Sequence, residues 1–237
     1  MNRYLTEFIG AFFLVLTICL VVSSTTESGG VLIGSITAGL TIGSVLMVMV
    51  YMGGHISGGH YNPAVTAAVA ARGGGAMRTH DVWPYMVAQV LGGLAAAIVA
   101  WAVTGKTVVP APAEGVSTSA ALLVEMLFTF ALALVVLNVA TSPQTKGNSY
   151  FGLAIGFTIT AAAYAGGGIS GGAFNPAVGV GMALISALDG GPWTHAWIYI
   201  VGPLVGGVLA AATYNVQHGV PLIHREMPPA HAPAAHA

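Results

Sequence analysis

Two short segments of this chain repeat the same chemistry. Asn62-Pro63-Ala64 and Asn175-Pro176-Ala177 each follow Ile-Ser-Gly-Gly and two further residues. Asn is among the best residues for capping a helix start, and Pro is favoured at the first helical position. Each segment is therefore predicted to begin a helix, whose unpaired backbone N–H groups carry about half a positive charge. While the Asn carbonyl oxygen caps that helix, the amide NH2 group is left to donate to a passing molecule.

The glycine turns before the two Asn residues offer a second chemical group, the backbone carbonyl. Glycine adopts unusual dihedral angles and permits close approach, so such turns can leave carbonyl oxygens facing a path. We expect one row of acceptors before Asn62 and a matching row before Asn175. The rows are formed by the carbonyl groups of Gly58, Gly59, His60 and Tyr61, and of Gly171, Gly172, Ala173 and Phe174.

Ionisable residues within apolar runs are candidates for transport, and Glu7 and Glu125 are of this kind. A carboxylate can instead accept the unpaired N–H groups of an interrupted helix, and we favour this supporting role. His55 and His60 flank the first glycine turn. A pH-sensitive gate is one interpretation, and a hydrogen-bonded structural histidine is the one we favour.

The sequence offers few residues for disulfide, metal or catalytic chemistry. Cys19 is the single cysteine, which excludes a disulfide or a cysteine metal site within one chain. Histidines near the C-terminus could hold a metal, but we interpret them as incidental; they are His218, His224, His231 and His236. No nucleophile–base pair or phosphate-binding loop stands out. We therefore expect no cofactor, no metal and no enzymatic activity.

The composition places these residues in a membrane. The chain has 237 residues, of which 56% are hydrophobic and only 5% charged. Soluble domains carry about 25% charged residues, so the solvent of this chain must be mostly lipid. The formal net charge of −1 offers no basic surface for nucleic acid.

A spanning helix needs about 20 mostly apolar residues. Six segments qualify: Tyr4–Ser23, Val31–Met52, Val82–Val103, Ser119–Ala140, Tyr150–Ala165 and Trp193–Tyr214. Two shorter apolar runs, 63–72 and 176–188, each follow a glycine turn and are predicted to enter the membrane without crossing it. The predicted fold is an all-α membrane bundle of six transmembrane helices and two re-entrant half-helices.

The two halves of the chain repeat each other. Residues 54–65 match 167–178, residues 85–93 match 199–207, and Glu7 has a counterpart in Glu125. We divide the chain into a first repeat at 1–110, a second at 111–216 and a mobile tail at 217–237. Because each repeat holds three spans, the second enters the membrane inverted, and a functional site is expected where the repeats meet.

Basic residues predict the orientation. Six spans place both termini on one side, together with five of the six Lys and Arg residues. Positive charge accumulates on the cytoplasmic side of membrane proteins, so both termini are predicted to be cytoplasmic.

These motifs resemble the aquaporin (major intrinsic protein) family over about residues 3–216, most closely at residues 6–10 and 54–66. The resemblance implies a homotetramer with one pore per subunit, and half-helices supported by Glu7 and Glu125. The family usually has Arg directly after the second Asn-Pro-Ala, where this chain has Val178. In this respect the chain resembles bacterial family members that lack this Arg, and by analogy the resemblance favours permeation by neutral metalloid hydroxides. The resemblance places the outer selectivity filter at Ile42, Ala163, Gly172 and Val178.

Such a filter has no charged or aromatic side chain, so it should be wide and weakly polar. We expect a passive channel in the cell membrane for water and small uncharged solutes, such as glycerol, urea, ammonia or arsenite-like metalloid hydroxides. A secondary transporter is the alternative, because inverted repeats with broken helices occur there as well. A transporter needs ion-binding acids, and Glu7 and Glu125 are the two available within the spans.

Overall fold

The computed structural model describes the backbone of residues 1–27 and 31–219 and the side chains of residues 1–24 and 37–219. This part of the chain is all helical, which confirms the predicted fold class. The helices are α1 (Asn2–Glu27), α2 (Val31–Ser57), α3 (Pro63–Arg72), α4 (Val82–Thr104), α5 (Thr118–Val136), α6 (Phe151–Ser170), α7 (Pro176–Leu188) and α8 (Ile198–Gln217). A π-helical turn, Leu137–Thr141, continues α5, and short 3-10 turns lie at Thr79–Asp81 and Pro143–Thr145.

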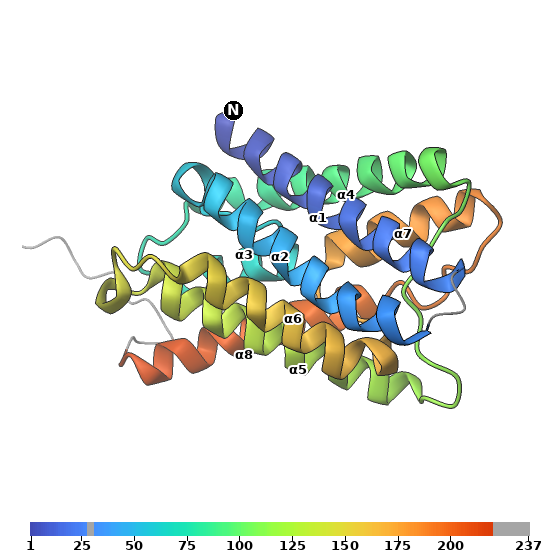
Figure 1. Cartoon of the computed structure of the whole chain (residues 1–237). Coiled ribbons are helices and arrows are strands. Elements are labelled where there is room, and N and C mark those ends of the chain that lie inside the picture. Colours follow the sequence, from blue (N-terminus) through green and yellow to red (C-terminus); the bar gives the residue numbers. More distant parts are fainter. Residues whose placement is uncertain (28–30, 220–237) are drawn as a thin grey trace, which may run out of the picture.

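Six of the described helices are long and apolar enough to cross a membrane: α1, α2, α4, α5, α6 and α8. They pack as neighbours, α1 beside α4, α5 beside α8 and α2 beside α6 (Figure 1). The two half-helices α3 and α7 are too short to cross a bilayer. Each packs against a long helix of the other repeat, α3 on α8 and α7 on α4, so the half-helices join the two halves of the chain.

Glycines bring these half-helices close to their long neighbours. A Cβ atom added at Gly207 of α8 would overlap the carbonyl oxygen of Ala64, and one added at Gly93 of α4 would overlap that of Ala177. The backbones of α3 and α7 therefore lie directly against α8 and α4. This contact fixes where the first turn of each half-helix lies.

The bundle has two ends, which we name for the described segments that they carry. The N-terminal face carries the start of α1, the α3–α4 loop, the α5–α6 connection and the end of α8, at the left in Figure 1. The opposite face carries the α4–α5 loop and the α7–α8 connection, at the right.

Several predicted boundaries were wrong. The last span begins at Ile198, not Trp193, because the intervening residues form hydrogen-bonded turns, with Ala196 N donating to Trp193 O over 3.0 Å. The fifth span continues to Ser170, since the glycines after Ala165 remain helical. The proposed tail 217–237 begins too early, because Gln217 still belongs to α8 and residues 218 and 219 form a turn. Residues 220–237, with three of the four tail histidines, lie outside the described residues.

Candidate functional site

Both half-helices begin with an Asn that caps its own first turn. Asn62 Oδ1 accepts from Ala64 N over 2.8 Å, and Asn175 Oδ1 accepts from Ala177 N over 2.9 Å. Both Asn residues have extended backbone angles, and proline follows as the first helical residue. These are the local features that favour a helix start at this point.

The two helix starts meet through these same side chains. Asn62 Nδ2 donates to Phe174 O, and Asn175 Nδ2 donates to Tyr61 O, each over 2.9 Å. Sequence reasoning left both amide NH2 groups free for a passing molecule. One hydrogen of each amide is instead committed to the other turn, so one hydrogen per Asn is left for a solute.

Glu7 of α1 holds the first turn from behind. Its Oε1 accepts from Ser57 Oγ over 2.6 Å and from His60 N over 3.0 Å. Its Oε2 accepts from Tyr61 N over 2.7 Å and from Gln89 Nε2 over 2.8 Å. The Glu7 side chain is fully buried, so these donors replace the water that an ionised carboxylate would otherwise bind.

Glu125 of α5 holds the second turn in the same way, with fewer partners. It accepts from Ser170 Oγ over 2.7 Å, from Ala173 N over 3.0 Å and from Phe174 N over 2.6 Å. It is also fully buried. Neither Glu7 nor Glu125 lines any of the three cavities along the path.

A narrow central cavity of about 30 Å³ surrounds the meeting point of the turns. Its lining includes the side chains of Asn62, Asn175 and His60, and every other side chain that lines it is apolar. The turn residues Gly59, His60, Gly172, Ala173 and Phe174 line the cavity too. A solute here meets a small polar cluster in an apolar tube.

Two further cavities lie at the ends of the central one. A vestibule of about 290 Å³ at the N-terminal face shares His60 and Val136 with the central cavity. A vestibule of about 450 Å³ at the opposite face shares six lining residues with it: Ile18, Ile42, Ala163, Gly172, Ala173 and Val178. The three cavities follow one another along the bundle, so the described residues outline a path from face to face.

All four residues that the resemblance assigns to the filter belong to the six shared with the opposite vestibule. The other predicted site residues are spread along the path. Gly58 lines the vestibule at the N-terminal face and Gly171 the one at the opposite face. Five more are buried in the turns and line none of the three cavities; they are Tyr61, Pro63, Ala64, Pro176 and Ala177.

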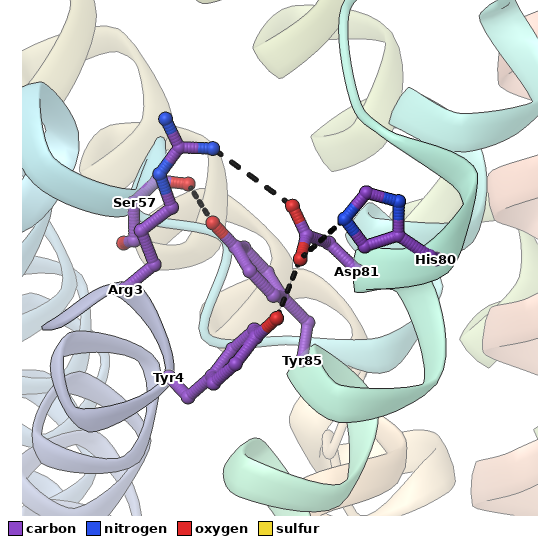
Figure 2. A network of polar contacts seen from close by, with 6 residues as sticks. All are labelled: Arg3, Tyr4, Ser57, His80, Asp81 and Tyr85. Atoms are coloured by element: carbon purple, nitrogen blue, oxygen red, sulfur yellow. Dashed lines mark hydrogen bonds and ion pairs between the residues drawn. The ribbon is translucent and has the colours of Figure 1, made fainter. Parts of the chain in front are cut away.

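A polar network lies at the N-terminal face (Figure 2), and four of its six residues line the vestibule there. Asp81 accepts from Tyr4 Oη over 2.6 Å and lies 3.8 Å from the Arg3 guanidinium and 3.7 Å from His80 Nε2. The Asp81 side chain is mostly buried, whereas Arg3 and His80 are largely exposed. The network ties the α3–α4 loop to the start of α1.

Tyr85 of α4 extends this network toward the first turn, because its Oη donates to Ser57 O over 2.8 Å (Figure 2). Sequence reasoning assigned no role to Tyr85, Gln89, Thr66 or Asp81. A polar Gln89 inside an apolar span was the one available signal, since buried polar side chains need partners. No group of three metal-binding side chains occurs among the residues that the structure describes.

Comparisons with known proteins agree with this geometry. Residues 1–214 match the family described as Major intrinsic protein. The aquaporin NIP1-1 of Zea mays is 36% identical over 217 residues, covering 91% of this chain and 74% of its own. The probable aquaporin TIP4-1 of Oryza sativa is 37% identical over 182 residues, which cover 75% of this chain and 70% of the relative.

A solved structure shows the same fold. The aquaglyceroporin from Plasmodium falciparum superposes with a TM-score of 0.79 at 20% identity, covering 90% of this chain and 95% of its own. The sequence matches also confirm the resemblance inferred from the Asn-Pro-Ala turns. The chain therefore belongs to the major intrinsic protein family and is a membrane channel for water and small solutes, not an enzyme.

Proposed function

We propose that this channel passes small uncharged solutes besides water, with glycerol, urea, ammonia and neutral metalloid hydroxides as candidates. One observation carries the proposal: the boundary between the central cavity and the opposite vestibule has no charged or hydrogen-bonding side chain. Ala163 and Gly172 are small, and Val178 stands where the family usually has Arg. Without a bulky Arg, the boundary leaves more room for a solute larger than water, and no fixed charge holds the solute there.

Ions are excluded by the helix starts in this proposal. The N-terminal ends of α3 and α7 meet within the central cavity, and each presents about half a positive charge. The apolar side chains of the wall do not replace the hydration shell of an ion. The Asn62 and Asn175 amides donate but do not accept on the path, because their oxygens cap the helices. A water bound there is a poor proton relay.

A coupled carrier is less well supported. Such a carrier needs acids that bind the coupling ion beside the substrate. Glu7 and Glu125 are engaged by the turns and line none of the three cavities, so neither faces a solute there.

The decisive experiment is a permeability panel on purified protein in liposomes, measured by stopped-flow light scattering. We compare wild type with Val178→Arg, and with Val178→Met as a control that adds length without charge. We expect Val178→Arg to lower glycerol and urea flux by about tenfold relative to water flux, with a smaller change for Val178→Met. Wild type that passes water but none of the solutes would contradict the proposal. Flux that follows an imposed proton gradient would favour the carrier.

We further propose that the protein resides in the cell membrane as a homotetramer with both termini in the cytoplasm. The assembly is carried over from family resemblance, and the orientation from the distribution of basic residues. The apolar side chains on the outside of the long helices, such as Leu91, Leu127 and Phe157, suit contact with lipid or with another subunit. A mass corresponding to one chain in mild detergent would count against the tetramer.

A further inference from the structure

The two boundaries of the central cavity differ in chemistry. Six apolar residues form the boundary with the opposite vestibule, whereas only His60 and Val136 are shared with the vestibule at the N-terminal face. We call this second boundary the inner neck. His60 is the one side chain at either boundary that has a hydrogen-bonding group. We propose that the inner neck, and His60 in particular, selects among the solutes that the apolar opposite boundary admits.

The repeat makes this asymmetry visible residue by residue. His60, Thr66 and Gln89 of the first half correspond to Ala173, Gly179 and Pro203 of the second half. Both turns have a buried Glu and a Ser, but only the first has these three additional polar side chains. Supporting a half-helix does not require them, because Glu125 and Ser170 hold the second turn without them. We therefore infer that His60, Thr66 and Gln89 have a function other than supporting the half-helix.

The three side chains form one hydrogen-bonded chain that fixes the His60 ring. Gln89 Nε2 lies 2.8 Å from Glu7 Oε2 and 2.8 Å from Thr66 Oγ1, so its two hydrogens are both used. Thr66 Oγ1 accepts one of them and lies 3.1 Å from His60 Nδ1, and we assign the Thr66 hydroxyl hydrogen to this contact because Thr66 Oγ1 already accepts from Gln89. His60 Nδ1 is then an acceptor, and the ring hydrogen lies on Nε2. Thr66 and Gln89 are positioning residues for that tautomer.

The Nε2 side of the ring borders Gly58 in the lining of the vestibule. A Cβ atom added at Gly58 would lie 3.1 Å from His60 Nε2, and both residues line the vestibule at the N-terminal face. Tyr85 packs against the ring, with centroids 5.4 Å apart, and limits its rotation. With this tautomer the neck presents one N–H donor, from His60, and the apolar side chain of Val136. A hydroxyl or carbonyl oxygen of a solute can accept from it.

This inference rests on the proposed function, because a neck selects only among solutes that enter. The test measures the flux of linear polyols of increasing length, from glycerol to erythritol and xylitol, into liposomes. We expect His60→Ala to raise the xylitol-to-glycerol permeability ratio by about tenfold, because loss of the ring widens the neck for the longer polyol. A tenfold change is at the low end of what a single contact contributes to discrimination between substrates. Val136→Ala enlarges the neck from α5 without touching the network, and should raise the ratio in the same direction if His60→Ala fails to fold.

A second pair of variants tests the positioning role. Thr66→Val removes the hydroxyl that orients His60, and Thr66→Ser retains it. The ¹⁵N signal of the His60 ring, identified by its absence in His60→Ala, should show a protonated Nε2 in wild type and Thr66→Ser. In Thr66→Val we expect a mixture of tautomers and a shift of the polyol ratio toward that of His60→Ala. A side chain with only a packing role would leave both readouts unchanged.

Two results would overturn the inference while leaving the proposed function intact. In the first, the wild type passes glycerol, but neither His60→Ala nor Val136→Ala changes the xylitol-to-glycerol permeability ratio. The second is a larger increase of the ratio in Ile42→Ala than in His60→Ala, which would place the selecting boundary at the opposite vestibule. Wild type that passes only water would instead refute the proposed function itself.

Discussion

Tyr61 and Phe174 show how single residues hold the pore turns in place. They have φ angles of 50° and 49°, in the left-handed region that residues other than glycine rarely adopt. Such a backbone conformation costs about 1–3 kcal/mol and persists only where surrounding contacts impose it. For Tyr61 the N–H donates to Glu7 and the carbonyl accepts from Asn175. Phe174 is held in the same way by Glu125 and Asn62.

A first prediction follows for the carboxylate that holds Tyr61. Glu7→Gln replaces one acceptor oxygen by an NH2 group where four donors converge. At least one buried donor then lacks a partner, which costs about 1–3 kcal/mol. We expect a lower thermal unfolding temperature in detergent and a reduced water flux.

Glu114→Gln is the matched control, because Glu114 is an exposed acid in the α4–α5 loop. It should leave both readouts at the wild-type value. An unchanged unfolding temperature for Glu7→Gln would show that the turn does not depend on the carboxylate.

At this scale the sequence predicted the motifs but not all of their partners. The two Asn-Pro-Ala segments and the two acids could be found because they repeat. Gln89 and Thr66 could not be assigned, because hydrogen bonds to residues far along the chain depend on helix packing that spacing does not reveal. The commitment of one hydrogen of each Asn amide to the opposite turn was missed for the same reason.

At the scale of elements, the half-helices are the parts whose positions matter most. They lie against long helices of the other repeat, at glycines that leave no room for a side chain. The existence of these elements was predictable from short apolar runs after glycine turns. Their ends were less predictable, because the glycines of 166–168 suggest a loop, whereas in the structure the helix continues through them. The π-helical turn at the end of α5 had no signal in the sequence.

A second prediction concerns this close packing. Gly207→Ala places a methyl group on the carbonyl oxygen of Ala64, so α3 or α8 must move. Overpacking of this kind costs about 1–3 kcal/mol. We expect a lower unfolding temperature and a loss of flux, since the Asn62 cap moves with α3.

Gly168→Ala provides the comparison within α6, where an added Cβ meets nothing within 4 Å. Alanine favours a helix over glycine by about 1 kcal/mol, so this variant should unfold at an equal or higher temperature. If Gly207→Ala were as stable and as active as Gly168→Ala, the close contact between α3 and α8 would have no importance for the pore.

At the scale of the whole molecule, the path is built from matching halves but its two ends differ. The N-terminal face presents Asp81 with its basic neighbours, the donor at His60 and most of the described basic residues, namely Arg3, Arg72, Arg78 and Lys146. The vestibule at the opposite face is lined by apolar side chains and glycines among the described residues. Solutes therefore meet different chemistry from the two sides, so the orientation in the membrane determines which end they meet first.

A last prediction tests that orientation. Cys19, the single native cysteine, is 2% exposed, so the native chain should react little with a thiol reagent. Lys146→Cys places an exposed thiol at the N-terminal face, and Glu114→Cys places one at the opposite face. If positive charge marks the cytoplasmic side, a membrane-impermeant maleimide added to intact cells should label Glu114→Cys at once, and Lys146→Cys only after the membrane is opened. The reverse pattern would place the His60 neck toward the outside, so that entering solutes met it before the apolar boundary.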